Sequence, residues 1–322
     1  MTASAPEPPL DLPVAVAGAG LTGASWAGLF ASAGLTVRLY DVDEASLPSA
    51  LERAAAAARF LATHGLVEAA VVEDGIGRLT ATSDAQQAFA GVGHVQECVR
   101  EDLALKREVF ALIDSIVPEE ALICTSSSGL SISEIQTAAS KPQRTLAAHP
   151  YNPPHLVPLV ELAPGALTSP QALQRARHFY TAVGKEPVVL SQDLPGYIAN
   201  RISAALWREA VDLVVRGVAS ADDVDRAICY GPGLRWAVMG PHLLYDLGGG
   251  PEGIRGHLQH LTGVKEGMLR DLATWTQFPL SSGDALAEGL EAEKAGKSFE
   301  ELTAERDELL AAYLAARRRL NS

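Results

Sequence analysis

Short apolar runs alternate with stretches of helical pattern over most of residues 13–190. Repeated strand–helix units of this kind predict a mainly parallel sheet with helices on both faces, because parallel neighbours need a long crossover. The predicted strands are Val14–Ala17, Val37–Tyr40, Leu79–Ala81, His94–Val99, Ala121–Thr125, Thr145–Ala148, Val157–Leu162 and Pro187–Leu190. The predicted helices include Leu21–Ala33, Glu44–Thr63, Leu103–Val117 and Gln171–Val183.

The pattern changes after Ser191, where the strand-like runs disappear and helical stretches rich in Ala, Leu, Glu and Arg follow. The last stretch opens with Ser298 and Glu301 at capping-box spacing and has an apolar stripe that includes Phe299 and Leu309. A chain of 322 residues is also long for a single core. We therefore expect a disordered tail (1–12), a doubly wound α/β domain (13–191) and an all-helical domain (192–322).

The composition of the chain excludes several kinds of binding partner. The 39 acidic residues outnumber the 26 basic ones, so nucleic acids and anionic membranes are disfavoured. No apolar run is long enough for a membrane helix, and the first residues lack the features of a secretory signal. The cysteines have no CxxC spacing, and His257 and His260 have no third ligand in view. We expect a soluble, cytoplasmic protein without a metal.

A glycine-rich loop follows the first predicted strand and opens a helix: Gly18-Ala19-Gly20-Leu21-Thr22-Gly23. Glycines at these three positions allow a tight turn, close approach of a pyrophosphate, and close packing of the helix on the strand. The second predicted strand ends at Asp41, whose carboxylate can accept hydrogen bonds from both ribose hydroxyls and repels a 2′-phosphate. The pattern predicts a dinucleotide site that prefers NAD to NADP.

Polar residues that suit alcohol oxidation follow the later strands. The serine run Ser126–Ser128 and His149 both lie where a parallel strand ends, and Glu161 lies inside an apolar strand. A carboxylate in that setting needs a partner, and an imidazole gains basicity and a fixed tautomer from it. A Ser hydroxyl and an Asn amide can hold the alcohol oxygen. The residues alone leave a structural histidine and an ordinary serine loop as the alternative.

Four motifs, in order, resemble those of the 3-hydroxyacyl-CoA dehydrogenase superfamily over nearly the whole chain from Val14. They are Ser128, His149-Pro-Tyr-Asn-Pro, Leu159-Val-Glu161 and Leu194-Pro-Gly-Tyr-Ile-Ala-Asn200-Arg201. The resemblance implies a Rossmann domain followed by a helical domain that forms a homodimer. It implies that His149 is the catalytic base, that Glu161 orients it, and that Ser128 and Asn200 bind the substrate oxygen.

The same resemblance extends the cofactor site. Glu101-Asp-Leu-Ala-Leu-Lys106 falls on the family's Glu-Asn-Leu-x-x-Lys stretch, which lies along the cofactor. Ser128 and Asn152 fall on positions beside the cofactor or the substrate. The expected cofactor-side residues are therefore Gly18, Gly20, Leu21, Thr22, Gly23, Asp41, Glu101, Lys106, Ser128 and Asn152.

One departure from the acyl-CoA members points to a branch of the family. Those members hold the CoA phosphates with lysine-rich helices after the second strand, whereas this chain has no Lys before Lys106 and only Arg53 and Arg59 on the matching helix. The helical part is similar to the L-carnitine dehydrogenase branch, and His-Pro-x-Asn-Pro-Pro is shared with the L-gulonate 3-dehydrogenase (lambda-crystallin) branch. Both branches act on free 3-hydroxy acids.

Such a substrate implies two further contacts in the helical part. Arg235 or Arg255 is our hypothesis for a bidentate grip on the substrate carboxylate. Trp236, Tyr245 and Trp207 have aromatic faces for a quaternary ammonium, although tryptophans at such places are more often core or interface residues. A thioester dehydrogenase and a non-enzymatic NAD-binding protein remain as alternatives.

Overall fold

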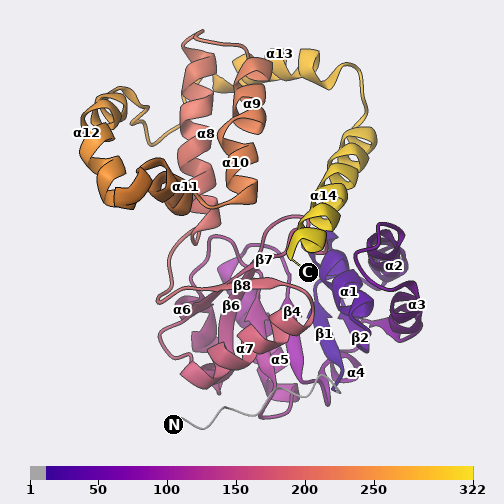
Figure 1. The fold of residues 1–322 in the computed structure, drawn as a ribbon. Helices are drawn as coiled ribbons and strands as arrows, with labels where there is room; N and C mark the ends of the chain where they lie inside the picture. Colours follow the sequence, from indigo (N-terminus) through magenta and orange to yellow (C-terminus); the bar gives the residue numbers. More distant parts are fainter. Residues whose placement is uncertain (1–11, 322) are drawn as a thin grey trace. The chain divides into compact units, whose positions relative to one another are not determined.

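The structure is a computed structural model that describes residues 12–321, so the predicted tail lies almost wholly outside the described residues. Its first part holds an eight-stranded sheet in the order β3-β2-β1-β4-β5-β6-β7-β8 (Figure 1). All neighbours pair in parallel except β6 and β7, which are antiparallel. The strands are β1 (Val14–Ala17), β2 (Val37–Tyr40), β3 (Leu79–Thr82), β4 (His94–Glu97), β5 (Leu122–Thr125), β6 (Thr145–Pro150), β7 (Leu159–Pro164) and β8 (Glu186–Val189). The predicted doubly wound, mostly parallel sheet is confirmed.

Helices cover both faces of this sheet (Figure 1). They are α1 (Leu21–Ser32), α2 (Leu47–Thr63), α3 (Ala69–Gly77), α4 (Ala85–Phe89), α5 (Leu103–Ile116), α6 (Ile132–Ile135) and α7 (Pro170–Ala182). Successive side chains of a strand point to opposite faces. Val14 and Val16 of β1 thus pack with buried residues of α1 and α7, whereas Ala15 and Ala17 pack with those of α4 and α5. The two apolar clusters hold the carboxyl ends of the strands in place.

The strand order reverses at β1, which pairs with β2 on one side and with β4 on the other. In open α/β sheets, ligands bind beyond the carboxyl ends of the strands at such a reversal. The glycine-rich loop after β1 and the serine run after β5 both begin at this edge of the sheet. The fold therefore brings the predicted cofactor loop and the predicted catalytic loop to the same edge.

The chain divides into two compact units after Ala199, later than the predicted boundary at 191/192. The second unit, residues 200–304, is helical within the described residues, as predicted. Its helices are α8 (Ala199–Val215), α9 (Ala221–Tyr230), α10 (Pro232–Val238), α11 (Pro241–Gly248), α12 (Gly253–Asp271) and α13 (Ser282–Lys294). Across residues 12–321, none of the helices is both long and apolar enough to cross a bilayer.

The last helix, α14 (Phe299–Asn321), returns to the first unit, with which the residues from Glu305 on are grouped. It opens with the predicted capping box, because the Ser298 N–H donates to Glu301 Oε2 over 2.8 Å and the Glu301 N–H donates to Ser298 Oγ over 3.2 Å. Further along, Ala311 is fully buried in the cluster that includes α1 and α2. Glu308 Oε2 lies 2.7 Å from Nε2 of His64, the residue that follows α2. The helix therefore covers the carboxyl end of α2.

Candidate active site

The loop between β1 and α1 requires glycine at two positions. Gly18 has a φ of +106°, and a Cβ on it would lie 2.8 Å from the backbone of Cys98. A Cβ on Gly23 would lie 1.8 Å from the Gly18 carbonyl oxygen. Around Gly20, the residue that precedes α1, a Cβ would meet nothing within 4 Å, and no side chain caps the helix. The loop thus leaves free space in front of unsatisfied N–H groups at a helix start, which suits a pyrophosphate.

Asp41 follows β2 and fixes this loop. Its Oδ2 accepts a hydrogen bond from the Ala19 N–H over 2.7 Å, and its Oδ1 accepts one from the Asp43 N–H over 3.0 Å. Arg53 of α2 donates to the Ala19 carbonyl over 3.1 Å. The carboxylate predicted to select NAD therefore lies directly against the glycine-rich loop, where a dinucleotide ribose would come.

The antiparallel pairing of β6 and β7 places His149 opposite Glu161. His149 Nδ1 lies 3.0 Å from Glu161 Oε2, and the two residues are 3% and 1% exposed. The other oxygen of Glu161 accepts hydrogen bonds from the N–H groups of Ile198 (2.8 Å) and Ala199 (2.9 Å). Burial raises the pKa of Glu161, but the hydrogen bonds from His149 and these two N–H groups outweigh it and lower the pKa below its usual value. Glu161 is thus held as a carboxylate that fixes the imidazole.

The far side of the imidazole faces Ser128, whose Oγ lies 3.1 Å from His149 Nε2. A carboxylate on Nδ1 favours the tautomer with the proton on Nδ1, in which Nε2 carries the lone pair that can accept a proton. Tyr197 stacks on the imidazole with its ring centroid at 4.8 Å and donates from its hydroxyl to the Ser127 carbonyl over 3.0 Å. Sequence reasoning gave Tyr197 no role, and the only signal for it was its place in the Leu-Pro-Gly-Tyr motif.

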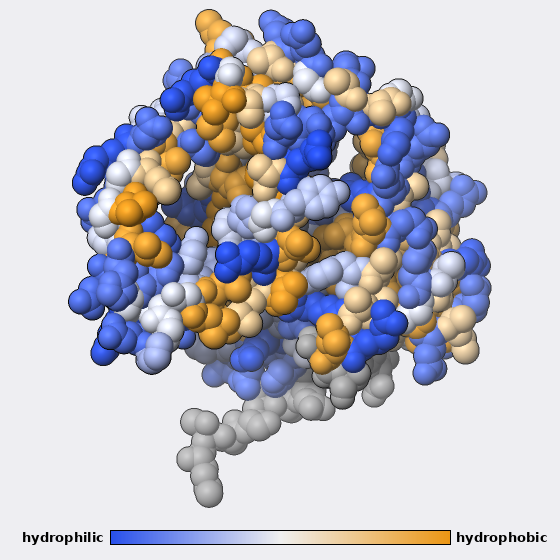
Figure 2. Space-filling view, turned by 45° about the horizontal axis from the view of Figure 1, so that its top comes forward, coloured by the Kyte–Doolittle hydropathy of each residue, from blue (hydrophilic) through white to orange (hydrophobic). Residues whose placement is uncertain are grey.

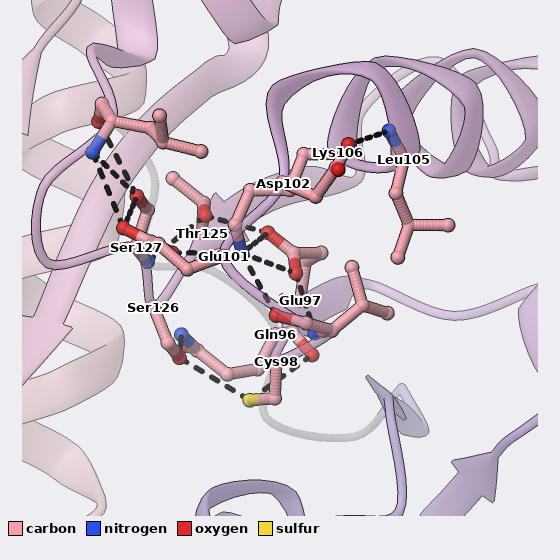
Figure 3. Close-up of polar contacts among 12 residues, drawn as sticks. Gln96, Glu97, Cys98, Glu101, Asp102, Leu105, Lys106, Thr125, Ser126 and Ser127 are labelled. Atoms are coloured by element: carbon pink, nitrogen blue, oxygen red, sulfur yellow. Dashed lines mark hydrogen bonds and ion pairs between the residues drawn. The ribbon is translucent and has the colours of Figure 1, made fainter.

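Glu101 holds the loop that carries Ser128 (Figure 3). Its Oε1 accepts a hydrogen bond from the Ser127 hydroxyl over 2.7 Å and from three consecutive backbone N–H groups. These belong to Ser128 (3.0 Å), Gly129 (2.8 Å) and Leu130 (3.2 Å). Burial raises the pKa of Glu101, and these bonds together with the nearby Lys106 ammonium lower it to below its usual value. A single carboxylate oxygen therefore fixes the backbone around the serine.

Lys106 supports this arrangement through the buried Glu97 (Figure 3). Its side chain is 1% exposed, and its Nζ donates to both oxygens of the buried Glu97, over 2.8 and 3.1 Å, and to the Val99 carbonyl over 3.1 Å. Glu101 Oε2 lies 3.6 Å from the same ammonium, and the Thr125 hydroxyl donates to Glu97 over 2.6 Å. Such a buried ion pair is retained only where each charge is fully hydrogen-bonded. Glu97 thus joins Lys106 to Thr125 and connects the ends of β4 and β5 next to the serine loop.

The first unit thus brings together Ser128, His149 and Glu161, with Glu101 behind them. Asn152 is exposed in the loop after β6, and Asn200 follows directly on Ala199, whose N–H binds Glu161. The residues predicted to bind the substrate carboxylate and ammonium are not among this group, because they lie in the second unit. They are Arg235 and Trp236 on α10, Tyr245 on α11, Arg255 on α12 and Trp207 on α8.

Two of the aromatic candidates already have contacts inside the second unit. The Tyr245 ring stacks on His257 at 4.8 Å and has the Lys265 ammonium at 3.6 Å from its centroid. Trp207 meets Phe278 edge-on at 5.1 Å. Among the described residues, no three His, Cys, Asp or Glu side chains are placed to hold a metal ion.

Comparison with known proteins identifies relatives over the full length of this arrangement. The family model for the NAD-binding domain of 3-hydroxyacyl-CoA dehydrogenase matches residues 13–194, and the model for its C-terminal domain matches residues 196–288. An L-carnitine dehydrogenase of Streptomyces coelicolor is 38% identical over 95% of each chain. Lambda-crystallin of Oryctolagus cuniculus is 35% identical over 84% of this chain and 83% of its own.

A solved structure resembles the described fold over almost its entire length. It is that of 5-formyl-3-hydroxy-2-methylpyridine 4-carboxylic acid 5-dehydrogenase, an NAD⁺-dependent dismutase. It is 30% identical, covers 96% of this chain and 98% of its own, and has a TM-score of 0.81. The acid in its name is a free carboxylic acid.

Proposed function

Because the chain belongs to the 3-hydroxyacyl-CoA dehydrogenase family, we propose that it oxidises the 3-hydroxyl of a small free 3-hydroxy acid to the 3-keto acid, with His149 as the base. It is an NAD-dependent oxidoreductase, as the family and its L-carnitine dehydrogenase relatives are. The observation that carries the choice of base is the position of the His149 imidazole between the Glu161 carboxylate and the Ser128 hydroxyl.

Oxidation of an alcohol removes a hydride from carbon and a proton from oxygen. The NAD that the glycine-rich loop and Asp41 would hold would supply the hydride acceptor. His149 Nε2 accepts the proton, since Glu161 keeps the other ring nitrogen protonated and stabilises the imidazolium that forms. Ser128 and Asn200 hold the substrate oxygen, Ser128 within hydrogen-bond distance of Nε2. In the reverse direction, His149 returns the proton to the carbonyl oxygen.

For the cofactor, we propose that the loop from Gly18 to Gly23, including Leu21 and Thr22, holds the pyrophosphate and that Asp41 holds the adenine ribose. The clearance around Gly20 and the uncapped start of α1 fit this assignment. Asn152 would lie on the nicotinamide side. Lys106 is 1% exposed, and we propose that its part in the cofactor site is to fix Glu101, 3.6 Å from its ammonium, and the backbone beside it.

Glu101 gives a test of how the serine loop is held. Glu101→Ala removes the acceptor of four hydrogen bonds and should lower kcat about 10- to 100-fold, because Ser128 loses its position. If Glu101 acts on the serine loop, KM for NAD changes less than about threefold. Glu108→Ala, at an exposed position on α5, the helix that follows Glu101, is the control and should leave both constants unchanged. A large rise in KM for NAD at unchanged kcat would instead make Glu101 a cofactor contact.

Two features of α2 favour a free acid over a CoA thioester. Its cations are engaged, because Arg59 forms two hydrogen bonds with Glu73 (2.8 and 3.0 Å) and Arg53 donates to Ala19 and to Ser49. A multiply charged CoA phosphate needs several available cations. The carboxyl end of the helix is also covered by α14 through Glu308. The surface that the resemblance assigns to CoA therefore offers little to bind it.

The substrate class is tested by following NADH formation with L-carnitine, L-gulonate and 3-hydroxybutyryl-CoA side by side. We expect kcat/KM for at least one free acid to exceed that for the thioester by about tenfold or more, a difference of about 1.4 kcal/mol in transition-state binding. Strong turnover of the thioester alone would contradict the free-acid assignment and leave the rest of the mechanism intact.

We further propose substrate contacts for residues of the second unit. Arg235 or Arg255 would bind the carboxylate, and Trp236, Tyr245 or Trp207 would face a quaternary ammonium. Lys265 already occupies a place over the Tyr245 ring, so Trp236, which is 37% exposed, is the better supported aromatic.

The same unit is our proposed dimer interface. Apolar patches interrupt the hydrophilic surface in the space-filling view (Figure 2). On α12, several large apolar side chains are 40–61% exposed: Leu258, Leu261, Val264 and Met268. Exposed apolar area of this kind is typical of a contact with another chain. We propose a homodimer that works in the cytoplasm, in line with the acidic composition and the absence of CxxC spacing.

A further inference from the structure

The loop that joins the two catalytic strands, residues 151–158, has few donors of its own. It contains Pro153, Pro154 and Pro158, which lack a backbone N–H. One end of the loop follows His149 closely and the other end precedes Glu161, so its conformation affects both. The Pro153 carbonyl accepts hydrogen bonds from the Leu156 and Val157 N–H groups inside the loop, both over 3.0 Å. The remaining buried carbonyls need partners from outside the loop, because buried unpaired carbonyls are costly.

Lys185, just before β8, supplies those partners. Its Nζ donates to the Pro154 carbonyl over 2.8 Å and to the Val157 carbonyl over 2.6 Å. The residue is only 3% exposed, and its ammonium lies 5.0 Å from the centroid of the Trp26 ring. One buried cation therefore bridges two carbonyls of the loop.

Burying a lysine side chain at this position costs free energy. Burial disfavours the charged form and lowers the pKa of Lys185 to about 7. An apolar side chain would avoid that cost but would leave the two carbonyls unpaired. Both the ammonium and the neutral amine carry at least two N–H groups, so the two bonds survive loss of the proton. We therefore attribute the presence of a lysine here to the two hydrogen bonds that its side chain donates.

A second attachment holds the same loop from α1. The Ser25 hydroxyl accepts a hydrogen bond from the His155 N–H over 3.0 Å, and its oxygen lies 2.8 Å from the His155 Nδ1. Beyond the loop, the Glu186 N–H donates to the Pro158 carbonyl over 2.8 Å, which continues the pairing of β7 with β8. The loop is thus bound on its inner side at Pro154, His155, Val157 and Pro158.

We propose that Lys185 is a positioning residue for the reaction: its two hydrogen bonds fix the loop between β6 and β7, and thereby the placement of His149 against Glu161 and of Asn152 within the loop. The inference rests on the proposed function, because it assigns to Lys185 a part in the work of the same pair. The proposed role requires no contact of Lys185 with the substrate or the cofactor.

The kinetic test is Lys185→Met, which keeps most of the length of the side chain and removes the donors. A misplacement of reacting groups by about 1 Å costs roughly 100-fold in rate, so we expect kcat to fall about 10- to 100-fold while KM for NAD changes less than about threefold. Lys185→Gln keeps donors on a shorter side chain, and its kcat should lie between those of the wild type and the Met variant.

The matched control is Arg144→Met. Arg144 is another buried cation, 5% exposed and 2.6 Å from Asp114 Oδ1, and it directly precedes β6 at the end remote from His149. This variant should lose thermal stability at least as much as Lys185→Met, yet keep kcat within about twofold, with all assays run below both melting temperatures. The inference fails if both Lys185 variants keep kcat within twofold of the wild type, or if Arg144→Met loses as much.

Amide hydrogen exchange supplies a measurement that does not depend on activity. Exchange at residues 151–158 should accelerate more than tenfold in Lys185→Met and should be unchanged there in Arg144→Met. If the wild type turned over no 3-hydroxy acid, the proposed function would fail while this measurement still showed whether Lys185 holds the loop. Equal exchange in the two variants would overturn the inference by itself.

Discussion

His149→Ala is expected to lower kcat by about 10²- to 10⁴-fold while NADH still binds, because the change removes the proton acceptor and leaves the glycine-rich loop intact. His149 is 3% exposed and lies on β6, whereas the cofactor loop follows β1. NADH fluorescence titration should give a Kd within about threefold of the wild type. Turnover is measured by NADH absorbance with the free acid that the substrate comparison selects.

His178→Ala is the control for this variant. His178 is a partly buried histidine on α7, outside the site. Its removal should leave kcat unchanged, which separates the loss of a catalytic imidazole from the general effect of losing a histidine. A His149→Ala enzyme with more than about a tenth of the wild-type kcat would remove His149 from the role of base.

Glu161→Gln is expected to lower kcat by about 10³- to 10⁴-fold with little change of shape, as a wrong tautomer does in comparable dyads. The amide nitrogen can donate to His149 Nδ1, which then moves the ring proton to Nε2, the atom that must accept the substrate proton. The amide oxygen can still accept from the Ile198 and Ala199 N–H groups, so the local fold is kept. The double variant with His149→Ala should be no slower than His149→Ala alone, because the two residues act as one unit.

The stability of Glu161→Gln against unfolding provides a second measurement of the role of Glu161. The pKa of Glu161 is lower in the folded chain than its usual value. The carboxylate therefore stabilises the fold at any pH above the usual pKa, and this stabilisation is lost as the pH falls through the folded pKa. The stability difference between wild type and Glu161→Gln should therefore shrink on acidification below about pH 4.5. Glu186→Gln, at an exposed position on β8, is the control. Wild-type kcat in Glu161→Gln would contradict the orienting role.

Much of the fold was predictable because strand burial and helix length are local in the sequence. Val14–Ala17 and Val37–Tyr40 match their predicted limits, since a strand buried on both faces is a continuous apolar run. The direction of β7 was not predictable, because an apolar run has no direction until its neighbours are known. The antiparallel pairing with β6 is nevertheless what sets His149 opposite Glu161.

The last helix shows a limit of periodicity. The capping box of Ser298 and Glu301 was correctly predicted from spacing alone. The apolar stripe was wrong in part, because Phe299 and Leu309 are 78% and 67% exposed, and the face that packs on the first unit centres on Ala311. A small residue fits close to α1 and α2 but contributes little to an apolar pattern, so nothing in the sequence indicates that the helix returns to the first unit.

In the active site, the sequence pointed to groups whose chemistry is unusual for their surroundings. Glu161 was identified because a carboxylate inside an apolar strand needs a partner. Tyr197 was missed, because an aromatic residue after Pro-Gly is compatible with any buried turn. The role of Glu101 on the serine loop was missed too, because its four hydrogen bonds join residues that are 26 to 29 positions apart.

The most direct test of the His149–Glu161 pair is the rate of NADH formation in a single turnover with the preferred 3-hydroxy acid and saturating NAD. A single turnover excludes product release, so its rate reports the chemical step in which the hydride and the proton leave the alcohol. Wild-type enzyme should form NADH rapidly, whereas His149→Ala and Glu161→Gln should each be slower by about 10²-fold or more, because each removes the oriented proton acceptor. An undiminished single-turnover rate in His149→Ala would contradict the assignment of His149 as the base.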